Sequence, residues 1–350
     1  MALPDKILKA FHVQMRACER LGSPFTARLC RLLPPALAAE TPVGLRVRDW
    51  AGDPIADALA LRVCGGLQWL ARQAPDSVLG AVFPPANRDD AALAEALDAT
   101  LSDRAGELLP WLDRPPQTNE VARSGILLGG LLHIADRTWP AVELLEIGAS
   151  AGVNLALDKQ SYDLGEGRVW GPEAAEVRIA CAWQGAPPPL EAPLRVVARA
   201  GCDAAPINAA DPEARDRMLA YIWPDQVARQ ARARAALLTA AGLGIRVERA
   251  DAGAWVPARL AEPARPATTR VVMHSIMWQY LPEATKEAIE GAIRDAGRAA
   301  TPASSVAWLR LEPDGAPHSA AILLDLWPGD LSLELGRGDY HGRWAEWADV

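Results

Sequence analysis

The chain has 350 residues, of which 50% are hydrophobic and 23% are charged, and its formal net charge is −8. This composition is too apolar for a disordered protein, and the length predicts about two domains or one large α/β unit with an extension. The acidic balance argues against a protein that wraps nucleic acid, because such proteins need a basic face. Tryptophan is unusually common, with 13 Trp against 3 Phe and 4 Tyr.

The cysteines and the start of the chain bear on the cellular compartment. Five cysteines are scattered along the sequence and form no C-x-x-C pair, which predicts buried free thiols, a reducing compartment and no metal site. No charged-then-apolar leader opens the chain. No apolar run reaches the ~18 residues that a membrane span needs. We therefore expect a cytoplasmic protein that neither enters a membrane nor binds nucleic acid.

Residues 1–135 are predicted to form a helical N-terminal region. Apolar residues at helical spacing predict a first helix over residues 4–21. Ser23 and Pro24 suit the N-cap and first turn of a second helix, which the prolines at 34 and 35 are expected to end. Further helices are predicted over three stretches: residues 54–74, residues 89–109, and a run that Thr118 or Asn119 caps and that ends at Ala135.

Residues 136–350 are predicted to form an α/β domain with a mainly parallel, doubly wound sheet and a late antiparallel edge. A first strand over 142–148 leads into a turn of small residues and the start of a helix. Two strand-like pieces predict a β-hairpin insertion at about 160–190, over the carboxyl edge of the sheet. The other predicted elements are strands at 194–198, 245–248, 270–274, 305–311, 320–326 and 331–335, and helices at 213–242 and 282–299.

The small-residue turn, residues 148–152, reads Gly-Ala-Ser-Ala-Gly and is open to three chemistries. It fits the dinucleotide pattern G-x-G-x-x-G poorly, because Ser150 and Leu155 stand where glycines are needed. It matches the G-x-S-x-G elbow of a serine hydrolase, with Ser150 as nucleophile. The triad would then need His341 and either Asp251 or Asp325. Against this stand the helical pattern before the strand and the buried acid near its end.

The third chemistry is the binding of S-adenosylmethionine. Glu146, two residues before the first glycine, fits the motif that anchors the amino-acid end of this cofactor. Asp203 follows the second predicted strand and would chelate the ribose hydroxyls, while Asp251 follows the third and would accept from the adenine amine. Each of these two aspartates also suits a turn or a helix cap. Three acids at successive strand ends are nevertheless more specific than any one of them.

The run 145–154, Leu-Glu-Ile-Gly-Ala-Ser-Ala-Gly-Val-Asn, resembles the signature of a bacterial family called domain of unknown function 2332. The segments 117–123, 199–206, 223–229 and 341–344 extend the resemblance over nearly the whole chain. It implies a Rossmann-like class I methyltransferase fold with a helical N-terminal region, and names no substrate. Ser150 departs from ordinary methyltransferases, which usually have Gly there, and its hydroxyl could bond the ligand carboxylate.

The candidate site residues follow from these patterns. The cofactor-binding candidates are Glu146, Gly148, Ser150, Gly152, Asn154, Asp203, Asp251, Asn119 and Arg123, the last of which could pair with a carboxylate. The catalytic candidates are His274, Glu312 and Tyr280. His274 lies at the end of the fourth strand and suits a general base, although a hydrogen-bonded structural histidine fits this position equally.

Methyl transfer from S-adenosylmethionine to an unknown acceptor is the expected activity, with a small molecule favoured over a macromolecule as acceptor. A fold that binds the cofactor without catalysis is the alternative. Some tryptophans in the insertion and the strand-end loops are expected to line an acceptor pocket, and those in the helical region to pack internally. The pocket candidates are Trp170, Trp183, Trp223, Trp278, Trp327 and Trp344.

Overall fold

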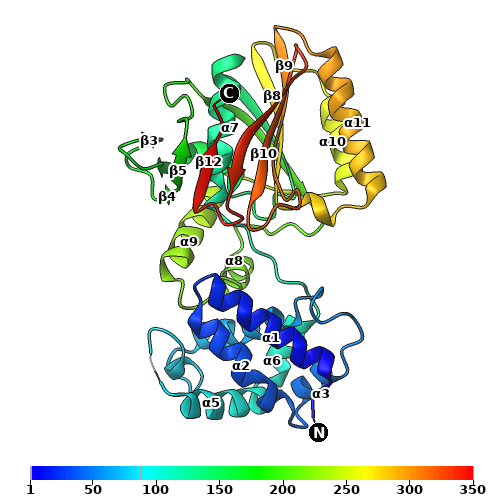
Figure 1. Cartoon of the computed structure of the whole chain (residues 1–350). Helices are drawn as coiled ribbons and strands as arrows, with labels where there is room; N and C mark the ends of the chain where they lie inside the picture. The colour runs from blue at the N-terminus through cyan, green and yellow to red at the C-terminus, as the bar shows by residue number, and fades with distance from the viewer. Residues whose placement is uncertain (1, 87, 350) are drawn as a thin grey trace. The chain divides into compact units, whose positions relative to one another are not determined.

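The computed structural model describes residues 2–86 and 88–349. The chain divides into two compact units, which we call the helical unit (residues 1–118 and 216–231) and the sheet unit (residues 119–215 and 232–350). Each is described by itself (Figure 1). The last helix of the predicted N-terminal region belongs to the sheet unit, because it packs on strands of the sheet.

The helical unit is built around one apolar core that its helices share. As predicted, Pro24 opens the second helix and the Ser23 side chain accepts a hydrogen bond from the Thr26 amide. The helices of residues 1–118 are α1 (Asp5–Arg20), α2 (Pro24–Leu37), α3 (Pro42–Arg48), α4 (Leu59–Gln73), η1 (Gly80–Val82), α5 (Asp90–Asp103) and α6 (Ala105–Leu112).

The predicted helices of this unit were wrong in three respects. Helix α2 passes through Pro34 and Pro35, because the Ala38 amide donates to both proline carbonyls and closes a last turn beyond them. The stretch 89–109 is two helices that meet at Arg104. Helix α3 was not predicted, although Thr41 caps it and a proline opens it, which is a signal that the sequence contains.

The sheet unit holds a nine-stranded sheet in the order β5-β12-β11-β10-β9-β8-β1-β6-β7. The strands from β7 to β9 run parallel, while β9 to β12 pair antiparallel, so the predicted parallel sheet with an antiparallel edge is confirmed. The bounds are β1 (Ala141–Ile147), β5 (Ala182–Gly185), β6 (Arg195–Asp203), β7 (Glu248–Arg249), β8 (Thr268–Ser275), β9 (Ser304–Glu312), β10 (Ala320–Trp327), β11 (Leu331–Gly338) and β12 (Trp344–Trp347).

Helices cover both faces of this sheet. On one face α10 (Ala252–Ala261) and α11 (Glu283–Ala299) share a core with Leu145 and Ile147 of β1. On the other face lies α7 (Arg123–Arg137), where a Cβ at Gly130 would meet the Leu309 side chain of β9 (Figure 1). The strand order reverses at β1, between β6 and β8. In open α/β sheets such a switch point creates a crevice at the carboxyl ends of the strands.

Connections between the strands differ from the prediction in two places. The insertion contains a hairpin of β2 (Ser161–Asp163) and β3 (Val169–Trp170), and β4 (Arg178–Ala180) adds parallel to β2, while β5 pairs with β12 instead. The predicted helix 213–242 is α8 (Pro212–Leu219) and α9 (Val227–Gly242), with Trp223-Pro224 in the break. The small-residue turn of residues 148–152, from here on called the glycine turn, leads into a 3-10 helix, η2 (Asn154–Lys159).

Candidate functional site

The turn after β1 is held in a conformation that few residues adopt. Gly148, Ser150 and Gly152 have positive φ angles of 67°, 52° and 74°. The turn packs closely on β6, since a Cβ at Gly201 would lie 2.7 Å from the Ala149 Cβ. The Ala149 amide donates to the Cys202 carbonyl at 3.0 Å. The backbone of the turn is therefore fixed beside the switch point.

Two predicted cofactor residues bond the turn itself. The Ser150 amide donates to Asp203 Oδ2 at 2.9 Å, and the other Asp203 oxygen accepts from the Ala205 amide. The Val153 amide donates to Asn119 Oδ1 at 3.2 Å. Asn119 is therefore not the cap of α7, whose N-cap position is Ala122. Both side chains shape the turn and hold it in place.

A buried amide that the sequence did not indicate supports the same segment. Gln160 is fully buried, its Nε2 donates to the Val153 carbonyl at 3.1 Å, and its Oε1 accepts from the Ser124 hydroxyl at 2.8 Å. Gln160 follows η2 in an irregular stretch, where neither helical nor strand periodicity gives a signal. This position could be found only from the fold.

Glu146 is a buried acid beside the turn, and its pKa is shifted strongly upward. Its side chain is buried in β1, and Oε1 accepts from Asn154 Nδ2 at 2.9 Å. Burial raises the pKa of Glu146 to about 8, against a lowering contribution from the Asn154 hydrogen bond. The nearby Asp203 carboxylate raises this pKa further, and the Arg123 guanidinium lowers it. Glu146 thus holds a proton near neutral pH in the ligand-free protein.

Three buried polar atoms in this region have no hydrogen-bond partner among the described residues: Glu146 Oε2, Ser150 Oγ and Asn154 Oδ1. Leaving a buried polar atom unpaired costs about 1–3 kcal/mol of folding free energy. Three such atoms within nine residues therefore destabilise the folded protein. Asn154 Oδ1 is an acceptor that needs a donor, Glu146 Oε2 is one as well when the carboxylate is ionised, and the Ser150 hydroxyl can donate. A ligand that carries both an ammonium group and a carboxylate would satisfy all three.

Arg123 and Asp251 lie at the amino ends of α7 and α10. Arg123 is the first residue of α7, and it donates to the carbonyls of Tyr340 at 2.8 Å and of Ser275, at the end of β8, at 3.4 Å. Asp251 occupies the N-cap position of α10, yet its exposed carboxylate makes no cap hydrogen bond. Asp203 is the last residue of β6, and Asp251 follows the adjacent strand β7.

His274 is buried within a cluster of hydrogen-bonded and stacked side chains. Trp308 Nε1 donates to His274 Nε2 at 3.1 Å, and His274 Nδ1 lies 2.7 Å from Glu312 Oε1. An indole N–H can only donate, so Nδ1 carries the ring proton and donates to Glu312. The Trp278 ring stacks on the imidazole at 4.8 Å. Both ring nitrogens are therefore engaged, and this geometry favours a structural role over that of a general base.

Replacing His274 by Ala is expected to destabilise the protein by about 2–4 kcal/mol, because it removes a buried ring, leaves the Trp308 N–H without a partner and takes one of the hydrogen bonds of Glu312 away. Denaturant unfolding followed by Trp fluorescence measures this change. The exposed His12, replaced by Ala, is the matched control and should change stability by less than about 0.5 kcal/mol. A His274→Ala variant as stable as the wild type would restore the general-base interpretation.

Glu312 and the loop after β8 complete this end of the sheet. Both Glu312 oxygens accept from the Met277 amide at 3.1 Å, which fixes the loop after Ile276, a residue with a positive φ of 52°. The Met277 side chain lies against Gly148, whose Cβ would come within 3.1 Å of it. The loop therefore borders the glycine turn. The third catalytic candidate, Tyr280, is 76% exposed.

Three tryptophans that were expected to line an acceptor pocket pack against side chains or helices of the sheet unit. Trp278 stacks on His274, Trp327 lies against Gly297 of α11, and Trp183 lies against Gly129 of α7. Glycine at these two helix positions leaves room for the indole rings. Ordinary packing thus accounts for these three side chains.

The hydrolase interpretation finds no support in the contacts of the described residues. Ser150 Oγ has no hydrogen-bond partner, so no histidine activates it. Asp325 is bonded to Arg310 and to Ser332.

Within residues 2–86 and 88–349, no group of three or more His, Cys, Asp or Glu side chains is placed to hold a metal ion. No helix there combines the length and apolar character needed to cross a membrane.

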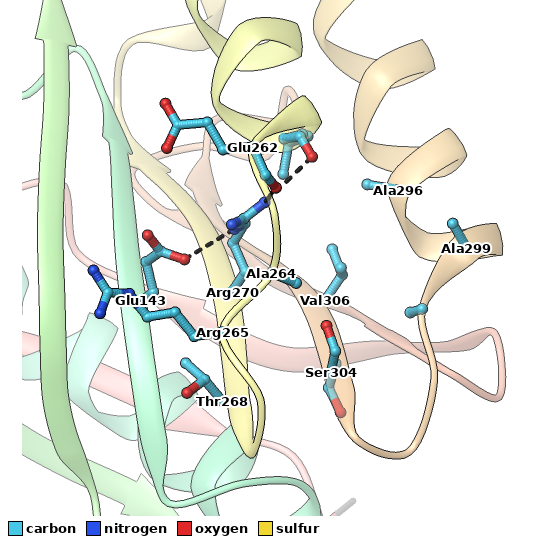
Figure 2. Close-up of a pocket in the computed structure, with 13 residues that line it drawn as sticks. Glu143, Glu262, Ala264, Arg265, Thr268, Arg270, Ala296, Ala299, Ser304 and Val306 are labelled. Carbon is cyan, nitrogen blue, oxygen red and sulfur yellow. Dashed lines mark hydrogen bonds and ion pairs between the residues drawn. The ribbon is translucent and has the colours of Figure 1, made fainter.

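A hollow of about 190 Å³ lies at the opposite end of the sheet, beside the first residues of β8 and β9 (Figure 2). Its most prominent charged group, Arg270, is only 6% exposed. Arg270 Nε donates to Glu143 at 2.9 Å, and its terminal nitrogens donate to the carbonyls of Arg259, Leu260, Glu262 and Pro263. The arginine thus caps the carboxyl end of α10, and its hydrogen bonds go to the protein itself.

Comparison with known proteins identifies the family. A family model described as an uncharacterized protein conserved in bacteria (DUF2332) matches residues 8–347. No curated protein and no solved structure matches the chain. The family match spans the helical unit and the sheet unit, including the glycine turn and the buried acid that precedes it. The chain therefore belongs to the DUF2332 family.

Proposed function

We propose that the turn after β1 binds S-adenosylmethionine and that the protein is a methyltransferase. The observation that carries the proposal is the set of three unpartnered, buried atoms on Glu146, Ser150 and Asn154. They lie at the carboxyl end of β1, beside the switch point where open α/β sheets bind ligands. Parallel strands in the order β7-β6-β1-β8-β9, with helices on both faces, also suit a Rossmann-like methyltransferase domain.

The residues present fit the amino-acid end of this cofactor. Its ammonium group would donate to Glu146 Oε2 and Asn154 Oδ1, which are acceptors without donors. At the ends of the neighbouring strands, Asp203 would accept hydrogen bonds from the ribose hydroxyls and Asp251 would accept one from the adenine amine. Asp203 already accepts two backbone amides, but each carboxylate oxygen has a second lone pair to offer.

The bound cofactor would supply a methyl group on a sulfonium, which an acceptor nucleophile can take without a metal. The chain's own contribution would be to orient the cofactor and to fix the loop after β8, through the bonds from Glu312 to the Met277 amide. Since His274 has both nitrogens engaged, we favour an acceptor that needs no strong base, and a small molecule over a macromolecule.

Isothermal titration calorimetry with S-adenosylhomocysteine, the demethylated form of the cofactor, tests the proposal. We expect one site per chain with a dissociation constant in the micromolar range, about −8 kcal/mol. Adenosine and methionine, titrated separately, should bind far more weakly, because each satisfies only part of the site. A folded protein that shows no heat with millimolar S-adenosylhomocysteine would refute the cofactor assignment. Binding without turnover on a panel of acceptors would favour a non-catalytic binding protein.

A further inference from the structure

We propose that Ser150 is a specificity residue, whose hydroxyl donates a hydrogen bond to the α-carboxylate of the bound ligand. This inference rests on the proposed function, since it concerns the same site. Ser150 departs from the glycine expected at this place in a methyltransferase turn, and its backbone has a φ of 52°, a region that favours glycine. Its side chain is only 5% exposed. A serine with this backbone conformation and a buried, unpartnered hydroxyl is unfavourable unless the hydroxyl binds a ligand.

The backbone of the turn has few donors left for an anion. The amides of Ala149 and Gly152 donate to carbonyls, at 3.0 and 2.7 Å. The amide of Ser150 donates to Asp203, and that of Val153 donates to Asn119. A carboxylate that lies on this turn therefore cannot be held by these four N–H groups, in contrast to the usual anion site of a glycine-rich turn.

The buried side chains leave a single donor. Asn154 Nδ2 is already bonded to Glu146, so Asn154 offers only its carbonyl oxygen. Glu146, once the ligand ammonium has displaced its proton, offers only its second carboxylate oxygen. Both would repel an anion. The Ser150 hydroxyl is the one unpartnered group of the three that can donate. The zwitterionic head of an amino acid is thus divided, with its ammonium on Glu146 and Asn154 and its carboxylate on Ser150.

A cycle of protein variants and ligands tests this assignment. S-adenosylhomocysteine and its decarboxylated analogue, 5′-(3-aminopropylthio)-5′-deoxyadenosine, are titrated into the wild type, Ser150→Gly and Ser150→Ala by calorimetry. Loss of one charge-assisted hydrogen bond corresponds to about tenfold to a hundredfold in affinity. We expect each serine variant to lose this factor for S-adenosylhomocysteine and to bind the analogue as the wild type does. Ser150→Gly also relieves the unfavourable φ, and we expect it to unfold at no lower temperature than the wild type.

The outcomes separate this inference from the proposed function. If the wild type binds neither ligand, the cofactor assignment falls and the inference falls with it. If the wild type binds S-adenosylhomocysteine but both variants weaken both ligands by the same factor, the hydroxyl does not contact the carboxylate, and only the inference is overturned. Unchanged affinity of the variants overturns it as well. Labelling of Ser150 by a fluorophosphonate would assign the hydroxyl to a nucleophile and also contradict the inference.

Discussion

Replacement of Glu146 by Gln is expected to weaken the binding of S-adenosylhomocysteine by about a hundredfold or more, because the ligand ammonium then faces a neutral amide in a buried site. Glu146 offers the ligand a carboxylate oxygen that has no other partner. Calorimetry of the two proteins measures the change. Glu191→Gln makes the same chemical change at an exposed position and is the matched control. An affinity loss below about threefold in Glu146→Gln would exclude the ion pair.

The same carboxylate makes ligand affinity depend on pH. Because burial raises the pKa of Glu146 to about 8, the free protein holds this group protonated below pH 8, and pairing with an ammonium expels the proton. Affinity for S-adenosylhomocysteine should therefore rise by up to about tenfold per pH unit between pH 6 and 7. Glu146→Gln should remove this dependence. A flat profile in the wild type would show that the group is ionised before the ligand binds.

Glu146→Gln should also change how protein stability depends on pH. The folded pKa of Glu146 lies above the ordinary value of 4.5, so the native state binds more protons than the unfolded state between these two values. The contribution of Glu146 to stability then falls as pH rises through this window, by at most about 1.4 kcal/mol per pH unit. Thermal unfolding from pH 5 to 8 should show the variant gaining on the wild type as pH rises. A constant difference across this range would contradict the burial of an unpaired carboxylate.

Replacement of Arg270 by Ala is expected to destabilise the sheet unit by about 3–5 kcal/mol, because it leaves a largely buried carboxylate and the end of a helix without their partner. Arg270 bonds Glu143 of β1 and four carbonyls at the carboxyl end of α10. Denaturant unfolding, analysed for each transition, measures the effect. The amino end of the sheet is not the proposed ligand end, so the variant should bind S-adenosylhomocysteine normally while folded.

Two further variants separate the charge of Arg270 from its shape. Arg270→Lys keeps the charge but lacks the planar fork that reaches several carbonyls, and we expect it to recover less than half of the loss. The double variant Glu143→Leu/Arg270→Met removes the stranded carboxylate and should be more stable than Arg270→Ala. If Arg270→Ala costs less than about 1 kcal/mol, the arginine does not cap α10 in solution.

The sheet and the turn were predictable because both leave local signals. Strands buried on both faces, such as β1 and β8, read as apolar runs, and small residues after a strand mark a tight turn. Glu146 was found as an acid at a fixed distance from the first glycine. Its partner Asn154 lies eight residues further along, so the pair itself could be seen only after the chain had turned.

Contacts between distant residues could not be predicted from the pattern. Trp308 lies 34 residues after His274 in the sequence, and its indole N–H donates to His274 Nε2. Because of this hydrogen bond, the imidazole ring has no free nitrogen. Strand β5 leaves the insertion because its partner β12 lies near the end of the chain. Arg123 donates to two distant backbone carbonyls, and its expected pairing with a ligand carboxylate stays a prediction. In each case spacing identified a residue and tertiary structure determined its partner.

A crystal structure with bound S-adenosylhomocysteine tests the central claim most directly. We predict that the ligand lies beyond the carboxyl end of β1, with its ammonium nitrogen about 2.7–3.2 Å from Glu146 Oε2 and its carboxylate within the same range of Ser150 Oγ. A ligand bound elsewhere, or one that leaves Glu146 Oε2 without a donor, would contradict the assignment of this turn as the cofactor site.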